Sequence, residues 1–258
     1  MKSLFQLLHR KCIRFYLRQR LKFQYPDMTI YTSQRNMLSL FHNLTQPGQC
    51  SVVTTNLAIK EQQMLGKSAF RILSTPNAGG SSIYSEALSI EFLSRLLGVD
   101  LFKTETELIY DYPEENNNGG TGPIMDYACH YQQLTLGVSV TRAMAYQRPY
   151  TKQDAYDLLI KKLAAIVKSS QNIANTKFDR HILHIWTESG KNAALVNKIC
   201  RKLRVHEQCK DTIILITTVN TQLVFFNHNL SLIKLQRQQQ FYQKSVRFFT
   251  RNKAWLEF

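Results

Sequence analysis

Two acidic residues occupy positions where a carboxylate needs an explanation. Glu86 falls at helical spacing with Ile90 and Leu93, on the face that should meet the protein core. Asp126 comes two residues after Ile124 in a stretch typical of a strand, so the two side chains should point to the same face. An ionised carboxylate that points inward requires an opposite charge or a metal ion. Both acids are therefore candidate site residues.

Each acid also has an ordinary explanation. Glu86 stands near the start of its predicted helix, where the helix dipole stabilises a negative charge. Asp126 follows a loop rich in glycine and asparagine and can cap that loop before its strand. The sequence leaves these alternatives open.

The elements that must position these acids follow from residue patterns. In chain order we expect a helix from about residue 82 to 97, strands at 103–112, 124–133 and 134–143, a helix starting at 150–151, a strand at 181–187, a helix at 192–203 and a strand at 212–219. Gly98 should end the first helix, and the strands at 124–133 and 134–143 should form a hairpin. Residues 28–76 predict one or two strands and short flanking helices. The order predicts an α/β fold with a mixed sheet and helices on its faces.

The order helix, three strands, helix, strand resembles the core of the PD-(D/E)XK nuclease superfamily, the restriction-endonuclease-like fold, over about residues 79–187. Gly79-Gly80 followed by Ser85-Glu86 is similar to the glycine-then-glutamate signature of its resolvase-type and exonuclease-type members. Asp126 lies where the second strand of that family carries its metal-binding aspartate. The resemblance implies that Glu86 and Asp126 are catalytic metal ligands for Mg²⁺, which orients water and neutralises phosphate charge.

The third strand departs from this family. Ser139 and Thr141 stand where the family places an acid and a lysine. Either the missing groups have migrated or the site is inactive. A migrated cation would come from Lys161 or Lys162, with Lys161 as the candidate catalytic residue.

Two further roles follow from the resemblance. Glu105 or Glu107 could supply the migrated acid, although their alternation with threonine is typical of a solvated edge strand. Arg142 should lie on the opposite face of its strand from Ser139 and is a candidate phosphate contact.

Positive charge is concentrated at the two ends of the chain. The net charge is +15, and residues 1–79 contain 11 Lys and Arg but only Asp27 and Glu61 as acids. Residues 212–258 contain six basic residues and one acid, Glu257. Basic arms on a nearly neutral body predict a polyanionic partner, with nucleic acid, either DNA or RNA, ahead of anionic lipid. Arms that serve solubility or targeting alone are the alternative.

The N-terminal arm has the pattern of a basic amphipathic helix from Met1 to about Gln24, ended by Pro26. Its candidate nucleic-acid contacts are Arg10, Lys11, Arg14 and Arg18. The same pattern is typical of a mitochondrial presequence or of a helix that lies on a membrane surface. We therefore expect an intracellular protein, with nuclear and mitochondrial locations both open.

Composition excludes several other classes. No stretch approaches the roughly 20 apolar residues of a spanning helix. The five cysteines are scattered without a CxxC pair, which disfavours a disulfide framework or zinc module. There is no GxSxG nucleophile elbow and no P-loop. The sequence thus predicts a basic N-terminal helix at 1–26, a flanking segment at 27–78, a nuclease-like core at 79–220 and a basic extension at 221–258. The predicted function is nucleic-acid binding, with an active Mg²⁺-dependent nuclease, a non-catalytic scaffold and a membrane-surface protein as alternatives.

Overall fold

The computed structural model describes residues 19–46, 48, 50–60, 64–76, 82–113, 121–203 and 210–225. The predicted contacts Arg10, Lys11, Arg14 and Arg18, and the C-terminal extension from residue 226, lie outside these ranges. The strands are β1 (Arg20–Gln24), β2 (Met28–Ser33), β3 (Ser51–Ile59), β4 (Asp100–Thr104), β5 (Tyr127–Tyr131), β6 (Leu134–Ala143), β7 (Arg180–Thr187) and β8 (Thr212–Val219). The helices are α2 (Gln34–Thr45), α3 (Lys67–Ser74), α4 (Ile83–Leu97), α5 (Lys152–Asn172) and α6 (Gly190–Leu203), with 3₁₀ turns η1 (Glu105–Glu107) and η3 (Gln222–Val224).

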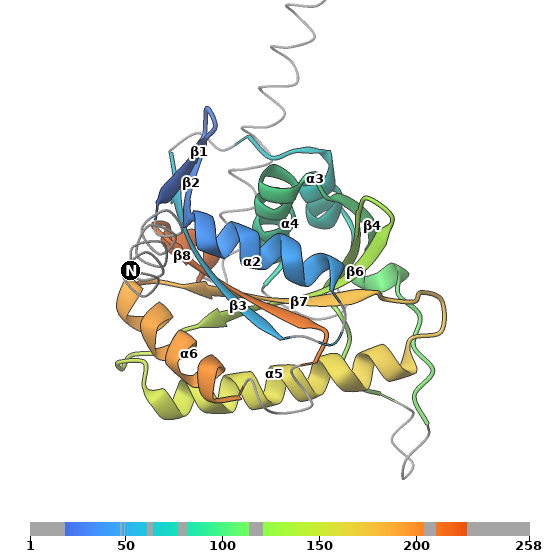
Figure 1. Cartoon of the computed structure of the whole chain (residues 1–258). Coiled ribbons are helices and arrows are strands. Elements are labelled where there is room, and N and C mark those ends of the chain that lie inside the picture. Colours follow the sequence, from blue (N-terminus) through green and yellow to red (C-terminus); the bar gives the residue numbers. More distant parts are fainter. Residues whose placement is uncertain are drawn as a thin grey trace, which may run out of the picture.

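All eight of these strands form one mixed sheet in the order β1-β2-β3-β8-β7-β6-β5-β4. The four central strands, β3, β8, β7 and β6, are parallel, and the outer strands pair antiparallel. Helices α2, α3 and α4 cover one face and α5 and α6 cover the other, each over its own apolar core (Figure 1). The expected α/β class with a mixed, helix-flanked sheet is confirmed. None of the helices in the described ranges is long and apolar enough to cross a membrane.

The prediction of a helix reaching Gln24 is wrong for residues 20–24, which form the edge strand β1. These residues alternate basic or polar with apolar side chains, and Leu21 and Phe23 pack against the core on one face of the sheet. A period of two suits a strand once β2 offers a partner. β2 and β3 continue the same sheet, so the strands before residue 79 belong to the sheet itself.

Polar contacts buried beneath α4 hold this helix against the sheet. Ser89 Oγ lies 2.7 Å from Tyr127 Oη and 2.7 Å from His184 Nδ1. The Trp186 indole donates a hydrogen bond to the Ser85 carbonyl at 3.1 Å. Complete burial lowers the pKa of His184 to about 3, so the imidazole is neutral at physiological pH. These contacts fix the first turn of α4 and therefore the direction in which Glu86 points.

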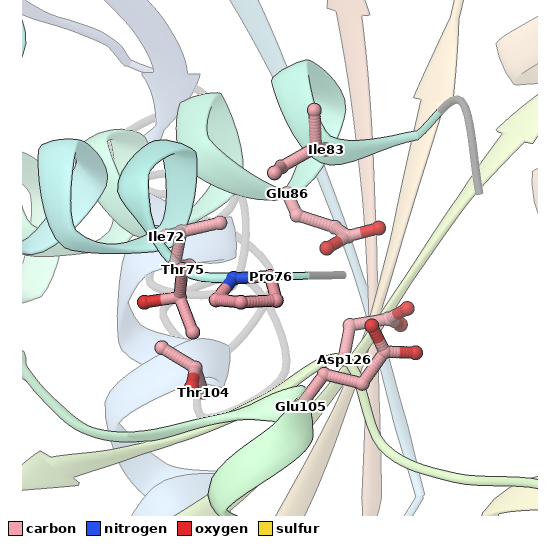
Figure 2. Close-up of a pocket in the computed structure, with 8 residues that line it drawn as sticks. All are labelled: Ile72, Thr75, Pro76, Ile83, Glu86, Thr104, Glu105 and Asp126. Atoms are coloured by element: carbon pink, nitrogen blue, oxygen red, sulfur yellow. The ribbon is translucent and has the colours of Figure 1, made fainter. Parts of the chain in front are cut away.

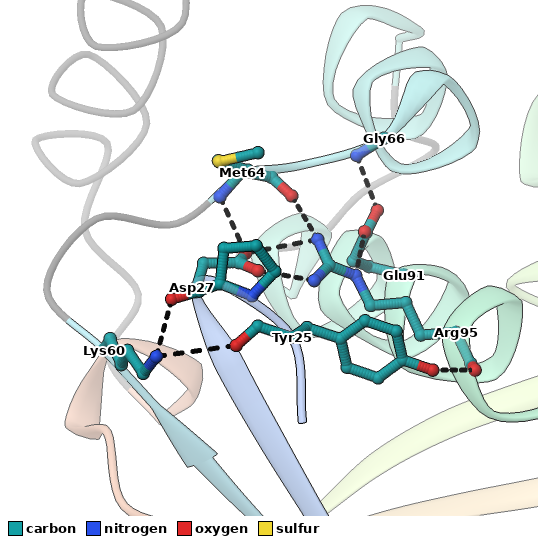
Figure 3. A network of polar contacts seen from close by, with 8 residues as sticks. Tyr25, Asp27, Lys60, Met64, Gly66, Glu91 and Arg95 are labelled. Carbon is teal, nitrogen blue, oxygen red and sulfur yellow. Dashed lines mark hydrogen bonds and ion pairs between the residues drawn. The ribbon is translucent and has the colours of Figure 1, made fainter. Parts of the chain in front are cut away.

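The other end of α4 is held by an ionic network centred on Arg95 (Figure 3). Its guanidinium lies 2.5 Å from Asp27 Oδ1 and 2.6 Å from Glu91 Oε1, and it donates to the Met64 carbonyl at 2.6 Å. Glu91 also accepts a hydrogen bond from the Gly66 amide at 2.6 Å. One arginine thus ties the start of β2, the segment before α3 and the end of α4 together.

Two predicted boundaries differ from the structure. The expected strand at 103–112 ends at Thr104, where the η1 turn begins, so Glu105 and Glu107 do not alternate along a strand. The turn forms because the Glu107 carboxylate accepts a hydrogen bond from the Thr104 amide at 2.7 Å and pairs with Arg71. The expected strand at 124–133 starts at Tyr127, which leaves Asp126 just before β5.

The remaining predicted elements of the core are confirmed. Gly98 ends α4 with φ of 73°, in the left-handed region that glycine favours. β5 and β6 form the expected tight hairpin, and Thr151 caps α5 through the Asp154 amide. The predicted strands at 181–187 and 212–219 are β7 and β8.

Candidate functional site

Asp126 extends the β5–β6 ladder by one residue beyond the end of β5. Its amide donates to the Val138 carbonyl at 3.1 Å, and its Oδ2 accepts from the Val140 amide at 2.6 Å. The preceding residue, Met125, donates from its amide to the Tyr110 hydroxyl at 2.8 Å. The side-chain oxygen Oδ2 of Asp126 thus serves the β6 backbone, whereas the capping role considered from the sequence concerned the loop before its own strand. These bonds fix the carboxylate at the end of the strand.

Glu86 lies in the first turn of α4 and is only 4% exposed. Its Oε1 accepts a hydrogen bond from the Ser82 hydroxyl at 2.6 Å. Burial, reinforced by the charge of Asp126, raises the pKa of Glu86 to about 8, and the charge of Glu105 adds to this effect. The favourable helix dipole does not offset this cost, so the buried carboxylate holds a proton at neutral pH.

The two acids meet at a small pocket between α3, α4 and the start of β5. Its volume is about 10 Å³, which is on the scale of one water molecule or a single bare ion. Figure 2 shows the carboxylates of Glu86, Glu105 and Asp126 projecting into the same space. The pocket is lined by Ile72, Thr75, Pro76, Ile83, Glu86, Thr104, Glu105 and Asp126. Residues 40 positions apart in the sequence are thus brought together, as the resemblance requires.

A lysine from α5 acts on both acids. Burial raises the pKa of Asp126, and the positive charge of Lys162 acts in the opposite direction. Lys162 has the same lowering effect on the pKa of Glu86. Lys162 is half-buried, whereas Lys161 is exposed. The two lysines differ in exposure because one step along a helix turns a side chain by about 100°. The catalytic role expected for Lys161 stays a prediction, and Lys162 is the lysine whose charge acts on the two acids.

Arg142 and Ser139 lie on opposite faces of the regular strand β6, as the alternation predicted. Burial lowers the pKa of Arg142, and the charge of Glu86 counteracts this effect. The guanidinium is therefore on the α4 side of the sheet, within electrostatic reach of Glu86. It is a cation at the border of a cluster of acids.

Ser139 forms a hydrogen bond to Asp126 that lowers the pKa of that carboxyl. The serine is buried, and Thr141 is half-buried on the same face of β6. The third strand thus supplies a hydroxyl that supports Asp126, in place of the acid that the resemblance leads one to expect.

The donor chemistry at the pocket fits Mg²⁺, because carboxylate oxygens are its preferred protein ligands. Glu86 and Asp126 would hold such an ion, with Glu105 beside them. Within the ranges that the structure covers, no three His, Cys, Asp or Glu side chains form a ready-made set of metal ligands. The ion pairs found there do not involve Glu86 or Asp126 either. A metal ion would supply the positive charge that this pair of acids lacks.

Comparison with known proteins gives one informative match. No family model matches the chain, and no solved structure matches it. Over 184 residues the chain is 30% identical to the AAC-rich mRNA clone AAC4 protein of Dictyostelium discoideum, an alignment that covers 66% of this chain. The aligned region spans 26% of that relative, about a quarter of its length. The name of the relative refers to an mRNA clone and states no activity.

Proposed function

We propose that this chain is a nucleic-acid-binding protein with a restriction-endonuclease-like core and a Mg²⁺-dependent phosphodiesterase site. The observation that carries the proposal is the pocket at which the buried Glu86 and the half-buried Asp126 face each other without an ion-pair partner among the described residues. Burial raises the pKa of both carboxyls, and the charge of Asp126 raises that of Glu86 further. Such perturbed acids are typical of metal and catalytic sites.

The strand arrangement around the pocket supports this core. The elements α4, β4, β5, β6, α5 and β7 follow one another in the order that the resemblance predicts. β4, β5 and β6 form an antiparallel meander, and β7 pairs parallel to β6 after the α5 crossover. Glu86 comes from the first helix of this unit and Asp126 from the start of its second strand. In the proposed core, both acids would therefore serve as the metal ligands.

Each residue at or near the pocket has its own role in the proposed reaction. A bound Mg²⁺ would neutralise charge on the phosphate and orient a water molecule. Glu86 would hold the ion in its deprotonated form, because a bound cation would offset the repulsion from Asp126. Lys162 keeps a positive charge beside both carboxylates and is the candidate for orienting the attacking water. In this proposal Arg142 would contact a phosphate next to the one that is cleaved.

The proposal is tested by cleavage of labelled single- and double-stranded DNA and RNA with Mg²⁺ or Mn²⁺. The wild-type chain is compared with Asp126→Asn, which retains an oxygen to accept from the Val140 amide. Asp100→Asn is the matched control, because Asp100 is an exposed acid of the edge strand β4. We expect cleavage by the wild type and by Asp100→Asn, and a loss of roughly 10²-fold or more in Asp126→Asn. Equal cleavage by both variants would refute the assignment of Asp126.

A second candidate is a binding module with the same core and no cleavage. Ser139 and Thr141 favour it, because two hydroxyls cannot replace an acid and a lysine as metal ligand and cation. In that case all three proteins bind nucleic acid in a salt-dependent manner, and no metal supports cleavage. Binding measured in parallel with cleavage therefore decides between the two candidates.

A further inference from the structure

A polar groove lies far from the acidic pocket, between α2, α6 and the first half of β3. Its volume is about 560 Å³. Figure 1 shows β3 running between α2 and α6, one helix on each face of the sheet. The α2–α6 groove is lined by Arg35, Asn36, Ser39, His42, Asn43, Cys50, Ser51, Val52, Thr54, Asn197 and Arg201.

The groove exists because β2 is shorter than β3. β2 pairs with β3 only from Asn56 to Ile59, so within the described residues no strand pairs with Ser51 to Thr55 on that side. α2 lies over this edge instead, and the Asn36 side chain donates to the Thr54 carbonyl at 2.6 Å. The floor of the groove is thus the edge of a sheet, where backbone polar groups are available.

The charged side chains among the described residues that line the α2–α6 groove are positive. Arg35 of α2 and Arg201 of α6 are exposed at its border. None of the described residues that line the groove is acidic, and neither helix contains an aspartate or a glutamate. In the described part of the chain, neither arginine takes part in an ion pair. Two helices that supply only positive charge to one groove favour an anionic ligand.

A second observation comes from the floor of the groove. Ser51 is only 6% exposed, and its buried hydroxyl has no hydrogen-bond partner among the described residues. An unsatisfied buried hydroxyl costs about 1–3 kcal/mol, so its retention calls for a ligand that it can bind. The side chains of Asn36, Ser39 and Asn197 add further hydrogen-bonding groups along the walls.

We infer that the α2–α6 groove binds phosphate groups, with the two arginines as charged donors and the Ser51 hydroxyl as a neutral one. Arginine suits this role because its planar guanidinium donates two parallel hydrogen bonds to a phosphate. β3 and β5 lie four strand positions apart in the sheet, which corresponds to about 19 Å at the usual strand spacing. The inference therefore goes beyond the acidic pocket and does not depend on catalysis there.

The test uses the full-length chain and three phosphate probes: pyrophosphate, ATP and a fluorescent 20-nucleotide single-stranded DNA. Wild type is compared with Arg35→Gln/Arg201→Gln, which removes both charges at exposed positions and should leave folding intact. Lys191→Gln is the matched control, because Lys191 is exposed on α6 outside the groove and about 15 Å along the helix from Arg201. Asp126→Asn is measured alongside, so that a failure of the acidic pocket is distinguished from a failure of the groove.

We expect the double variant to bind at least one probe about tenfold more weakly, with Lys191→Gln within about twofold of wild type. Loss confined to the DNA identifies a polynucleotide strand as the ligand, and the slope of log K against log salt should then fall by roughly 1.4. Loss that includes ATP or pyrophosphate identifies a nucleotide or free phosphate. Ser51→Ala should also weaken the affected probe several-fold. Binding of all probes by the double variant within twofold of wild type, or binding of none by wild type, would overturn the inference.

Discussion

Glu86 and Glu91 lie five residues apart on the same helix, and each is only 4% exposed. Glu91 pairs with Arg95 at 2.6 Å and accepts from the Gly66 amide at 2.6 Å (Figure 3). Glu86 has a serine hydroxyl as its hydrogen-bond donor and faces Asp126 and Glu105 (Figure 2). The two acids thus have equal burial and opposite electrostatic surroundings.

The comparison shows that burial alone does not mark a functional acid. Both glutamates lose their hydration, but the Arg95 network returns an opposite charge to Glu91 within the fold. At Glu86 burial and the charge of Asp126 raise the pKa more than the charge of Lys162 lowers it, so the carboxyl keeps a proton at neutral pH. A missing counter-charge is therefore the feature that distinguishes a candidate site from a structural ion pair.

The largest expected effect follows from removing Arg95, the positive charge that pairs with Glu91. Arg95→Met leaves Asp27 and Glu91 buried without their cation, and we expect a loss of about 3–5 kcal/mol in the free energy of unfolding. Urea denaturation at pH 7 measures it. Arg71→Met is the control, because the Arg71–Glu107 pair has side chains 42% and 41% exposed and should cost at most about 1 kcal/mol. Equal losses in the two variants would contradict the role assigned to Arg95.

The next largest effect concerns Lys162, whose positive charge acts on both Glu86 and Asp126. Lys162→Met should reduce metal-dependent cleavage by roughly 10²-fold, because the acids lose the cation that favours their ionised forms. The pH at which half the activity is reached should also rise. Lys161→Met is the matched control and should stay within about twofold of wild type, since its side chain is exposed. A larger loss in Lys161→Met than in Lys162→Met would restore the sequence-based choice.

The smallest effect contrasts the two glutamates directly. The pKa of Glu86 is raised from 4.5 to about 8, so the folded state binds more protons than the unfolded state between these values. Its contribution to stability is fully present below about pH 4.5 and is lost as the pH rises toward 8. Without added metal, Glu86→Gln should therefore be more stable than wild type at pH 8 by on the order of 1–3 kcal/mol, and the gain should shrink toward pH 5.

The groups that act on the Glu86 carboxyl, and therefore on this pH dependence, are Ser82, Asp126, Glu105, Lys162 and Arg142. Glu91→Gln should have the opposite effect and destabilise the chain at both pH values, because Arg95 loses a charged partner. Urea midpoints of both variants at pH 5 and 8 give the comparison. Destabilisation by both substitutions at pH 8 would show that Glu86 is neutralised by a protein group after all.

Local signals in the sequence were sufficient for much of the core. Gly98, the tight turn between β5 and β6, and Thr151 before α5 each act through their own backbone or neighbouring residues, so their positions could be predicted. The failures lie where a distant segment decides. Residues 20–24 form a strand because β2 offers a partner. β4 ends at Thr104 because the η1 turn begins there, and the pairing of Glu107 with Arg71 stabilises that turn.

The candidate site shows the same division. The sequence by itself determined that Glu86 and Asp126 are inward-facing acids on the first helix and near the second strand of an α-β-β-β-α-β unit. Only the tertiary structure decided that they share one pocket, that Lys162 rather than Lys161 approaches them, and that the equally buried Glu91 is neutralised by Arg95. The α2–α6 groove was likewise invisible, because Arg35 and Arg201 are 166 positions apart in the chain. Residue type and periodicity specify which face a side chain takes, whereas the charges that meet it are set by the packing of distant elements.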